Sequence, residues 1–124
     1  ILEAVRLPKR SEEELALRGA AIREATMQAT LVPLGSAKAC LGVMRLCLRA
    51  LGRGRASSAT DAAVGFLAAK AGFEGAILNV KVNLGGIKDE GFLSSTKEET
   101  DALSIQVSAL EKEYGELLSK TLGF

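Results

Sequence analysis

Apolar residues recur along this chain at intervals of three and four, the spacing that brings side chains onto one face of an α-helix. The clearest case lies within residues 33–51, where two apolar rows run side by side. A helix with so wide an apolar face is expected to be central and contacted from more than one side. The first row is Leu34, Ala37, Leu41, Met44, Leu48 and Leu51, and the second is Cys40, Val43, Cys47 and Ala50.

Capping residues and helix breakers mark the first boundaries. Ser11 followed by Glu14 has the spacing of a capping box, so a helix is expected to begin there. Pro33 is tolerated in the first turn of a helix, and we expect it to open the second one. Glycines and serines over 52–58 predict a loop. The apolar positions of the first helix are Leu15, Ile22, Ala25 and Ala29.

Two more helices are predicted after that loop. One runs from about Thr60 to Leu84, and the other begins near Ser95, with Glu98 in capping-box register. Three glycines inside the former each cost up to about 1 kcal/mol relative to alanine, which suggests close helix approach or space for a ligand. These glycines are Gly65, Gly72 and Gly75. The expected apolar faces are Val64, Leu67, Ala71, Leu78 and Val82 in one helix, and Leu103, Val107, Leu110, Tyr114 and Leu117 in the other.

The composition agrees with an all-helical chain. Apolar residues make up 48% of the sequence and aromatic residues only 4%, which suits packed helices better than a β-sandwich. We predict an all-α, antiparallel helical bundle forming a single domain over residues 1–124. Residues 1–6 have the pattern of a helix end that Pro8 stops, so we expect the N-terminal helices of the domain to be missing.

Several classes of site are excluded. The chain has no histidine, and its two cysteines lie roughly 10 Å apart along a helix, too far for a disulfide. We therefore expect no metal site and no Ser-His-Asp triad. A net charge of +1 argues against a nucleic-acid binder. Three basic residues within 31–51 argue against a membrane span, and we expect a cytoplasmic protein with reduced cysteines.

Three polar residues stand out on the helix predicted over 60–84. Asp61 falls in its first turn, where a carboxylate most simply complements the helix dipole. Asn79 and Asn83 lie one turn apart within an apolar run, so their amides either tie helices together or bind a polar ligand. Asp61 and Asn79 share a face but lie roughly 27 Å apart on an unbroken helix. They cannot hold the same small group within one subunit.

Four stretches of the chain resemble the cyclodeaminase family, which includes the C-terminal domain of formimidoyltransferase-cyclodeaminase and bacterial methenyltetrahydrofolate cyclohydrolases. They follow the order and spacing of the family over nearly the whole chain. The most specific is the last, because N-V-x-x-N-L within a helix is rare. The stretches are residues 2–9, Val32-Pro33-Leu34, Thr60-Asp61-Ala62 and residues 75–84.

The resemblance implies a homodimer of helical bundles that binds a tetrahydrofolate derivative and needs no metal or redox cofactor. The first expectation is a formimidoyltetrahydrofolate cyclodeaminase, an ammonia-lyase that closes 5-formiminotetrahydrofolate to 5,10-methenyltetrahydrofolate. One alternative is methenyltetrahydrofolate cyclohydrolase, and another is a non-catalytic helical module for assembly or regulation. The expected partners are the folate substrate and a second copy, with no nucleic acid and no membrane.

The resemblance also assigns site residues. The family's catalytic aspartate corresponds to a position before Ile1, so the catalytic residue is not expected within these 124 residues. The aspartate and the two asparagines match family positions and are expected to orient the pterin, while basic residues are expected to meet the glutamate tail. The predicted substrate-binding residues are therefore Asp61, Asn79, Asn83, Lys81 and Lys9.

Overall fold

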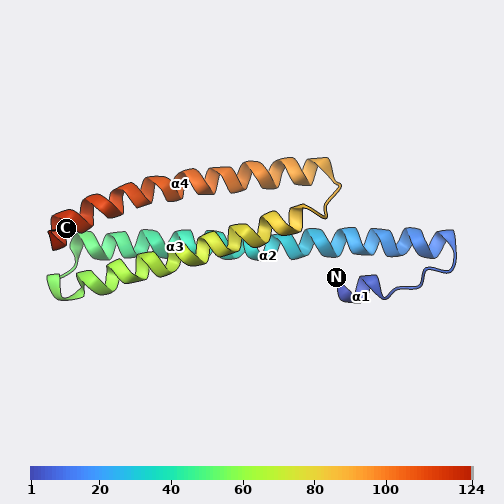
Figure 1. Cartoon of the computed structure of the whole chain (residues 1–124), viewed down its shortest axis with the longest axis horizontal. Helices are drawn as coiled ribbons and strands as arrows, with labels where there is room; N and C mark the ends of the chain where they lie inside the picture. Colours follow the sequence, from blue (N-terminus) through green and yellow to red (C-terminus); the bar gives the residue numbers. More distant parts are fainter. Residues whose placement is uncertain (124) are drawn as a thin grey trace.

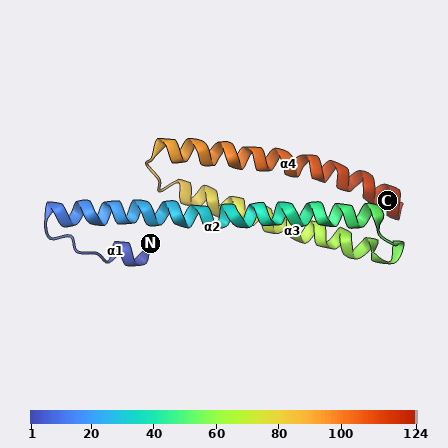
Figure 2. The ribbon, with the colours of Figure 1, turned by 180° about the vertical axis from the view of Figure 1, so that it is seen from behind.

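The computed structural model describes residues 1–123, which contain helices and short connections but no strand, so the all-α prediction is confirmed. A single turn, α1 (Leu2–Val5), is followed by three long helices, α2 (Glu12–Arg53), α3 (Ala56–Leu84) and α4 (Glu90–Leu122). In Figure 1, α3 runs back along α2 and crosses it at a shallow angle, and α4 runs back along α3. The view from behind shows the same crossing, with α4 beside the pair (Figure 2).

Helix α2 begins where predicted, but it does not end before Pro33. The Ser11 hydroxyl accepts a hydrogen bond from the Glu14 backbone N–H at 3.1 Å and caps the helix. The prediction that Pro33 opens a separate helix was wrong, because α2 remains helical on both sides of it. An interior proline costs about 3 kcal/mol. Packing of the buried row on both sides of Pro33 offsets that cost.

Two later boundaries also differ from the prediction. The loop expected over 52–58 is reduced to Gly54 and Arg55, and α3 begins at Ala56. The fourth helix begins before Ser95, because Asp89 caps it by accepting a hydrogen bond from the Phe92 N–H at 2.8 Å. An aspartate is as good an N-cap as a serine, so sequence spacing alone did not choose between them.

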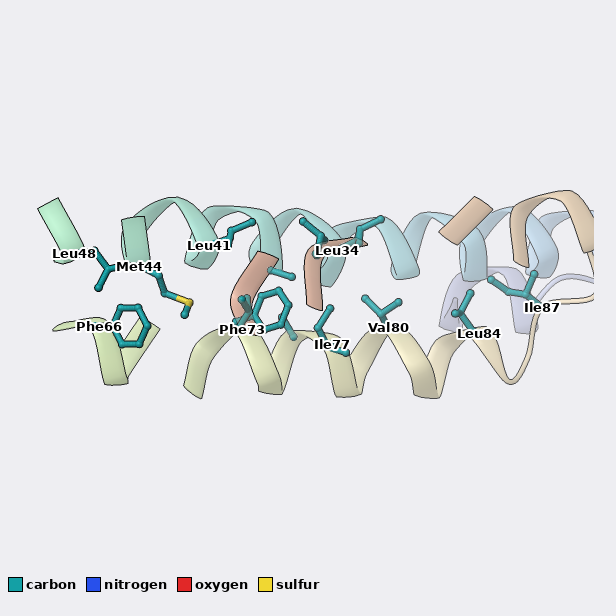
Figure 3. Close-up of a cluster of buried hydrophobic side chains, with 14 residues drawn as sticks. Leu34, Leu41, Met44, Leu48, Phe66, Phe73, Ile77, Val80, Leu84 and Ile87 are labelled. Atoms are coloured by element: carbon teal, nitrogen blue, oxygen red, sulfur yellow. The ribbon is translucent and has the colours of Figure 1, made fainter. Parts of the chain in front are cut away.

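The core follows the first apolar row of α2, which is buried throughout, as predicted. This row packs against a row of α3 that includes Phe66, Phe73 and Val80 (Figure 3). Leu103 and Val107 of α4 complete the cluster. One copy of the chain therefore covers this row with its own helices. The second row differs: its cysteines are half-buried, while Val43 and Ala50 are exposed.

The predicted apolar face of α3 was also wrong. Leu78 and Val82 are 64% and 74% exposed, and Val64, Leu67 and Ala71 are exposed as well. Because α3 is apolar around most of its circumference, its periodicity does not reveal which side meets the other helices. The side that it buries is Ala59, Ala63, Phe66, Phe73, Ala76, Ile77, Val80 and Leu84.

The sides of α2 and α3 that meet neither each other nor α4 leave apolar residues exposed. We call this set the outer face. By length and composition, α2 and α3 are each apolar enough to cross a membrane, a test that core helices of soluble proteins also pass. The outer face consists of Val32, Val43 and Leu46 of α2 and Val64 and Val82 of α3.

Polar and aromatic contacts fix α4 against the other two helices. Lys38 of α2 pairs with Glu99, and Lys70 of α3 pairs with Glu111. The Phe66 ring of α3 stacks on Tyr114, with ring centroids 4.3 Å apart. Buried aromatic stacking adds to the area that the rings bury. These contacts set the register of α4 along α2 and α3.

Candidate functional site

The contact between α2 and α3 repeats every seven residues. A Cβ added at Gly65 would lie 3.0 Å from the Cys47 sulfur, and one added at Gly72 would lie 2.9 Å from the Cys40 sulfur. Both thiols are free and fill the space that these glycines leave. Close helix approach is thus confirmed at two of the three glycines. At Gly75, an added Cβ would meet no atom within 4 Å.

One seven-residue step further, a groove replaces this close contact. It lies where Pro33 of α2 comes beside Asn79 of α3, and we call it the Pro33 groove. Two of the four stretches that carry the family resemblance meet here, Val32-Pro33-Leu34 and residues 75–84. They are distant in sequence, so the folding of α3 onto α2 is what brings them together. The groove is lined by Ala29, Val32, Pro33, Ser36, Asn79 and Asn83.

The two asparagines of the groove are held differently. The Asn83 side chain is half-buried, and its Nδ2 donates a hydrogen bond to the Ala29 backbone carbonyl of α2 at 3.0 Å. The Asn79 side chain is exposed, and its Nδ2 donates to the Gly75 carbonyl of its own helix at 3.2 Å. The amide of Asn83 therefore ties α3 to α2, one of the two roles predicted for it. Asn79 has no link to another helix and is accessible from the groove.

None of the side chains that line the groove is ionisable. The groove therefore offers hydrogen-bond donors and acceptors beside apolar surface, a composition suited to binding rather than to proton transfer. Within residues 1–123, no three cysteine, aspartate or glutamate side chains lie close enough together to hold a metal ion.

The other predicted site residues lie elsewhere. Lys81 is exposed and lines a cleft between α3 and α4 with Leu93, Lys97 and Asp101. Lys9 is exposed in the segment between α1 and α2. Of the five predicted residues, the structure brings only Asn79 and Asn83 together.

Asp61 lies near the opposite end of α3. Because α3 begins at Ala56, Asp61 is not in its first turn, and that placement was wrong. The helix is unbroken between Asp61 and Asn79, so the separation of roughly 27 Å stands. Asp61 therefore cannot share a small ligand group with Asn79 within one copy of the chain.

The sequence analysis did not predict that Pro33 and Ala29, one turn before it, line a groove. A signal for both was present, because the burial pattern of α2 continues through Pro33: Thr30 is fully buried and Leu34 follows one turn later. Counting Thr30 as part of the apolar row would have extended the helix across the proline.

Comparison with known proteins gives the family. Residues 1–102 match the family described as formiminotransferase-cyclodeaminase. The chain belongs to this family. It is 37% identical, over 97% of its length, to a methenyltetrahydrofolate cyclohydrolase of Methylorubrum extorquens, and the match spans 58% of that relative. Two formimidoyltransferase-cyclodeaminases, from Mus musculus and Sus scrofa, are 32% and 29% identical over 82% of the chain and 19% of each relative.

The match confirms the predicted family, and the matched residues include all those that line the Pro33 groove. The chain spans little more than half of the Methylorubrum relative and about a fifth of the two mammalian relatives. The match to the cyclodeaminase family ends at residue 102, whereas α4 continues to Leu122 and buries Leu103 and Val107 beyond that point. The packed unit therefore extends past the matched segment.

Proposed function

We propose that the chain functions in a methenyltetrahydrofolate cyclohydrolase and binds the folate at the Pro33 groove. The observation that carries the proposal is the 37% identity over nearly the whole chain to a relative of that name. The cyclodeaminases share fewer residues over less of the chain, which favours the cyclohydrolase over the activity that the sequence analysis placed first. The position of the groove, where two family-like stretches meet, supports the proposed site.

The reaction defines what the groove has to do. Water adds to the methenyl carbon, the bond from that carbon to N5 breaks, and N5 keeps the bonding electrons, giving the 10-formyl form with net release of one proton. A general base and acid are needed for this step. The groove contains neither, so its part is to bind and orient, and the exposed amide of Asn79 can both donate to and accept from the polar edge of the pterin. No metal or redox cofactor is required by this chemistry.

Basic residues outside the groove are proposed to bind the glutamate tail. Lys81 lies close to Asn79 in sequence but towards α4, where Lys97 lines the same cleft. The two ammonium groups outnumber the one carboxylate of the cleft, that of Asp101, so its lining keeps a net positive charge that suits a glutamate tail. Lys9 precedes the start of α2, and Asp61 follows the end of this 42-residue helix, so a role for both at one folate requires a second copy of the chain.

We also propose that a second copy covers the outer face. Gly35, Gly42 and Gly75 of α2 and α3, like Gly115 of α4, have no atom within 4 Å of an added Cβ, so no contact among the described residues accounts for their cost in the helices. Glycines let a further helix approach closely. Sedimentation should give a dimer for the natural chain and a monomer for Val82→Lys. Ile105→Lys, at an exposed position of α4, is the matched control. A monomeric natural chain that floats with phospholipid vesicles would instead assign the face to a membrane.

The activity is tested by supplying 5,10-methenyltetrahydrofolate and 5-formiminotetrahydrofolate separately. Hydrolysis of the first without ammonia release from the second is expected. Ammonia release would instead establish the cyclodeaminase. Tetrahydrofolate binding without turnover of either compound would identify a folate-binding part of the enzyme, and an absence of both binding and turnover would favour the assembly module. Asn79→Ala should weaken binding, whereas Gln28→Ala, another exposed amide that bonds within its own helix, should not.

A further inference from the structure

Pro33 removes one hydrogen bond from α2. In an α-helix, the carbonyl of residue 29 accepts from the N–H of residue 33, and proline has no N–H to donate. Ala29 is half-buried against α3, so its carbonyl is only partly open to water. A buried carbonyl without a donor is unfavourable. A donor from outside the helix is therefore needed at this position.

Asn83 supplies that donor. Its Nδ2 lies 3.0 Å from the Ala29 oxygen. In the part of the chain that the structure describes, this is the one hydrogen bond between α2 and α3. The hydrogen bond between the two helices thus lies at the carbonyl that proline leaves without a donor.

We propose that Asn83 is a positioning residue of the Pro33 groove, whose amide replaces the N–H that Pro33 lacks, while Asn79 alone of the two contacts the ligand. This inference rests on the proposed function, because it divides the roles of two residues that the family resemblance treats alike. Asn79 bonds only within its own turn and can exchange that bond for one to a ligand without loosening the helix pair.

A double-mutant cycle in stability tests the link directly. Asn83→Ala should raise the unfolding equilibrium constant about tenfold, because it leaves the Ala29 carbonyl unpaired. In a Pro33→Ala background, the new N–H of residue 33 can serve that carbonyl, so Asn83→Ala should cost much less. If Asn83→Ala alone does not fold, the double variant should recover helical circular dichroism. Equal costs in both backgrounds, or no recovery, would overturn the proposal.

The nearly isosteric change Asn83→Asp separates the two atoms of the amide. It keeps the oxygen but replaces the donor with an acceptor that repels the carbonyl. It should therefore be at least as destabilising as Asn83→Ala when Pro33 is present. If the Oδ1 atom were the important one, the aspartate variant would be tolerated, and the proposed role would be wrong.

Ligand affinity is a second measurement, and a change in stability alone does not alter it. Tetrahydrofolate carries the pterin and the tail but no one-carbon unit, so it can be titrated without reaction. Asn79→Ala should weaken its binding with either residue at position 33, whereas Asn83→Ala should weaken it only when Pro33 is present. Equal weakening by Asn83→Ala in both backgrounds would make Asn83 a ligand contact and refute the inference. If the natural chain binds no tetrahydrofolate, the proposed function fails, while the stability cycle still tests the link.

Discussion

The interface between α2 and α3, which we call the seam, has two parts that are held together by different contacts. In its first part, Cys47 and Cys40 lie over Gly65 and Gly72, and the helices are held by close steric fit. One step further, Pro33 and the asparagines leave a groove, and a single hydrogen bond replaces the steric fit. The tight part therefore fixes the register of the two helices. That register brings Asn79 beside Pro33, so the close packing of the two helices positions the proposed binding surface.

The difference between the two parts shows where changes are tolerated. Close-packed interiors respond to the addition of a single methyl group, because neighbouring atoms have no space to move into. An open groove responds to the loss of a particular donor or acceptor instead. We therefore expect the first part of the seam to control stability and the second to control binding.

The largest effect is expected at Gly72. The substitution Gly72→Val places a branched side chain where even a Cβ would lie 2.9 Å from the Cys40 sulfur, and it should destabilise the chain by about 1–3 kcal/mol. Chemical denaturation measures the change. The companion change Cys40→Ala removes the sulfur and should restore part of the loss. An additive penalty in the double variant would show that the contact is not the cause.

A smaller effect of opposite sign is expected at Gly75, which lies on the same helix but meets no atom within 4 Å. Gly75→Ala should stabilise an isolated chain by up to about 1 kcal/mol through helix propensity alone. Thermal unfolding at low protein concentration measures this gain. At high concentration the gain should shrink if a second copy packs against the outer face, and a concentration-independent gain would contradict that packing.

At Asn79 the effect on stability should be smaller still. Its side chain is exposed and bonds only within its own turn, so Asn79→Ala should change the free energy of unfolding by less than about 0.5 kcal/mol. The loss should appear in tetrahydrofolate affinity instead. Calorimetric unfolding and ligand titration on the same variant compare the two quantities. A large loss of stability with unchanged affinity would reverse the proposed division of the seam.

The smallest effect is expected on the α4 side of α3, away from the Pro33 groove. The Glu111 carboxylate raises the pKa of Lys70 above its ordinary value, first by a hydrogen bond and then by charge attraction, with Glu74 adding to it. A raised pKa in the folded state means that the stabilisation is complete below the unfolded pKa of about 10.4 and is lost as the pH rises through the folded value.

The melting temperatures of the natural chain and Lys70→Gln should therefore differ slightly from neutral pH to about pH 9.5 and converge above the unfolded pKa of about 10.4. Lys112→Gln, an exposed lysine of α4 outside the ion pairs described, is the matched control. A difference that persists unchanged at strongly alkaline pH would exclude the ion pair as its source.

Local periodicity predicted much of the fold. The row from Leu34 to Leu51 is buried as predicted, and the α4 residues Leu103 and Val107 are in the core. Such rows can be predicted because residues three and four apart in sequence lie on the same face of any α-helix. The same reasoning chose the wrong side of α3, because a helix that is apolar around most of its circumference has no face marked by sequence alone.

The candidate site was predicted in its residue types rather than in its arrangement. An asparagine inside an apolar helical run had to bond to another helix or to a ligand, and Asn83 does the former. Neither its partner nor its distance could be predicted, since Ala29 is 54 residues away and offers only a backbone carbonyl. The five predicted substrate-binding residues are spread over the bundle, with two of them at the groove.

By itself, the sequence determined that the chain is helical, which row of α2 is buried, and to which family the chain belongs. The tertiary structure decided that α2 continues through Pro33, which side of α3 faces inward, and why an asparagine stands at position 83. The reason is physical. Helix formation depends on neighbours three and four residues apart, whereas the carbonyl that proline leaves free is satisfied only when a distant helix reaches it in the right register.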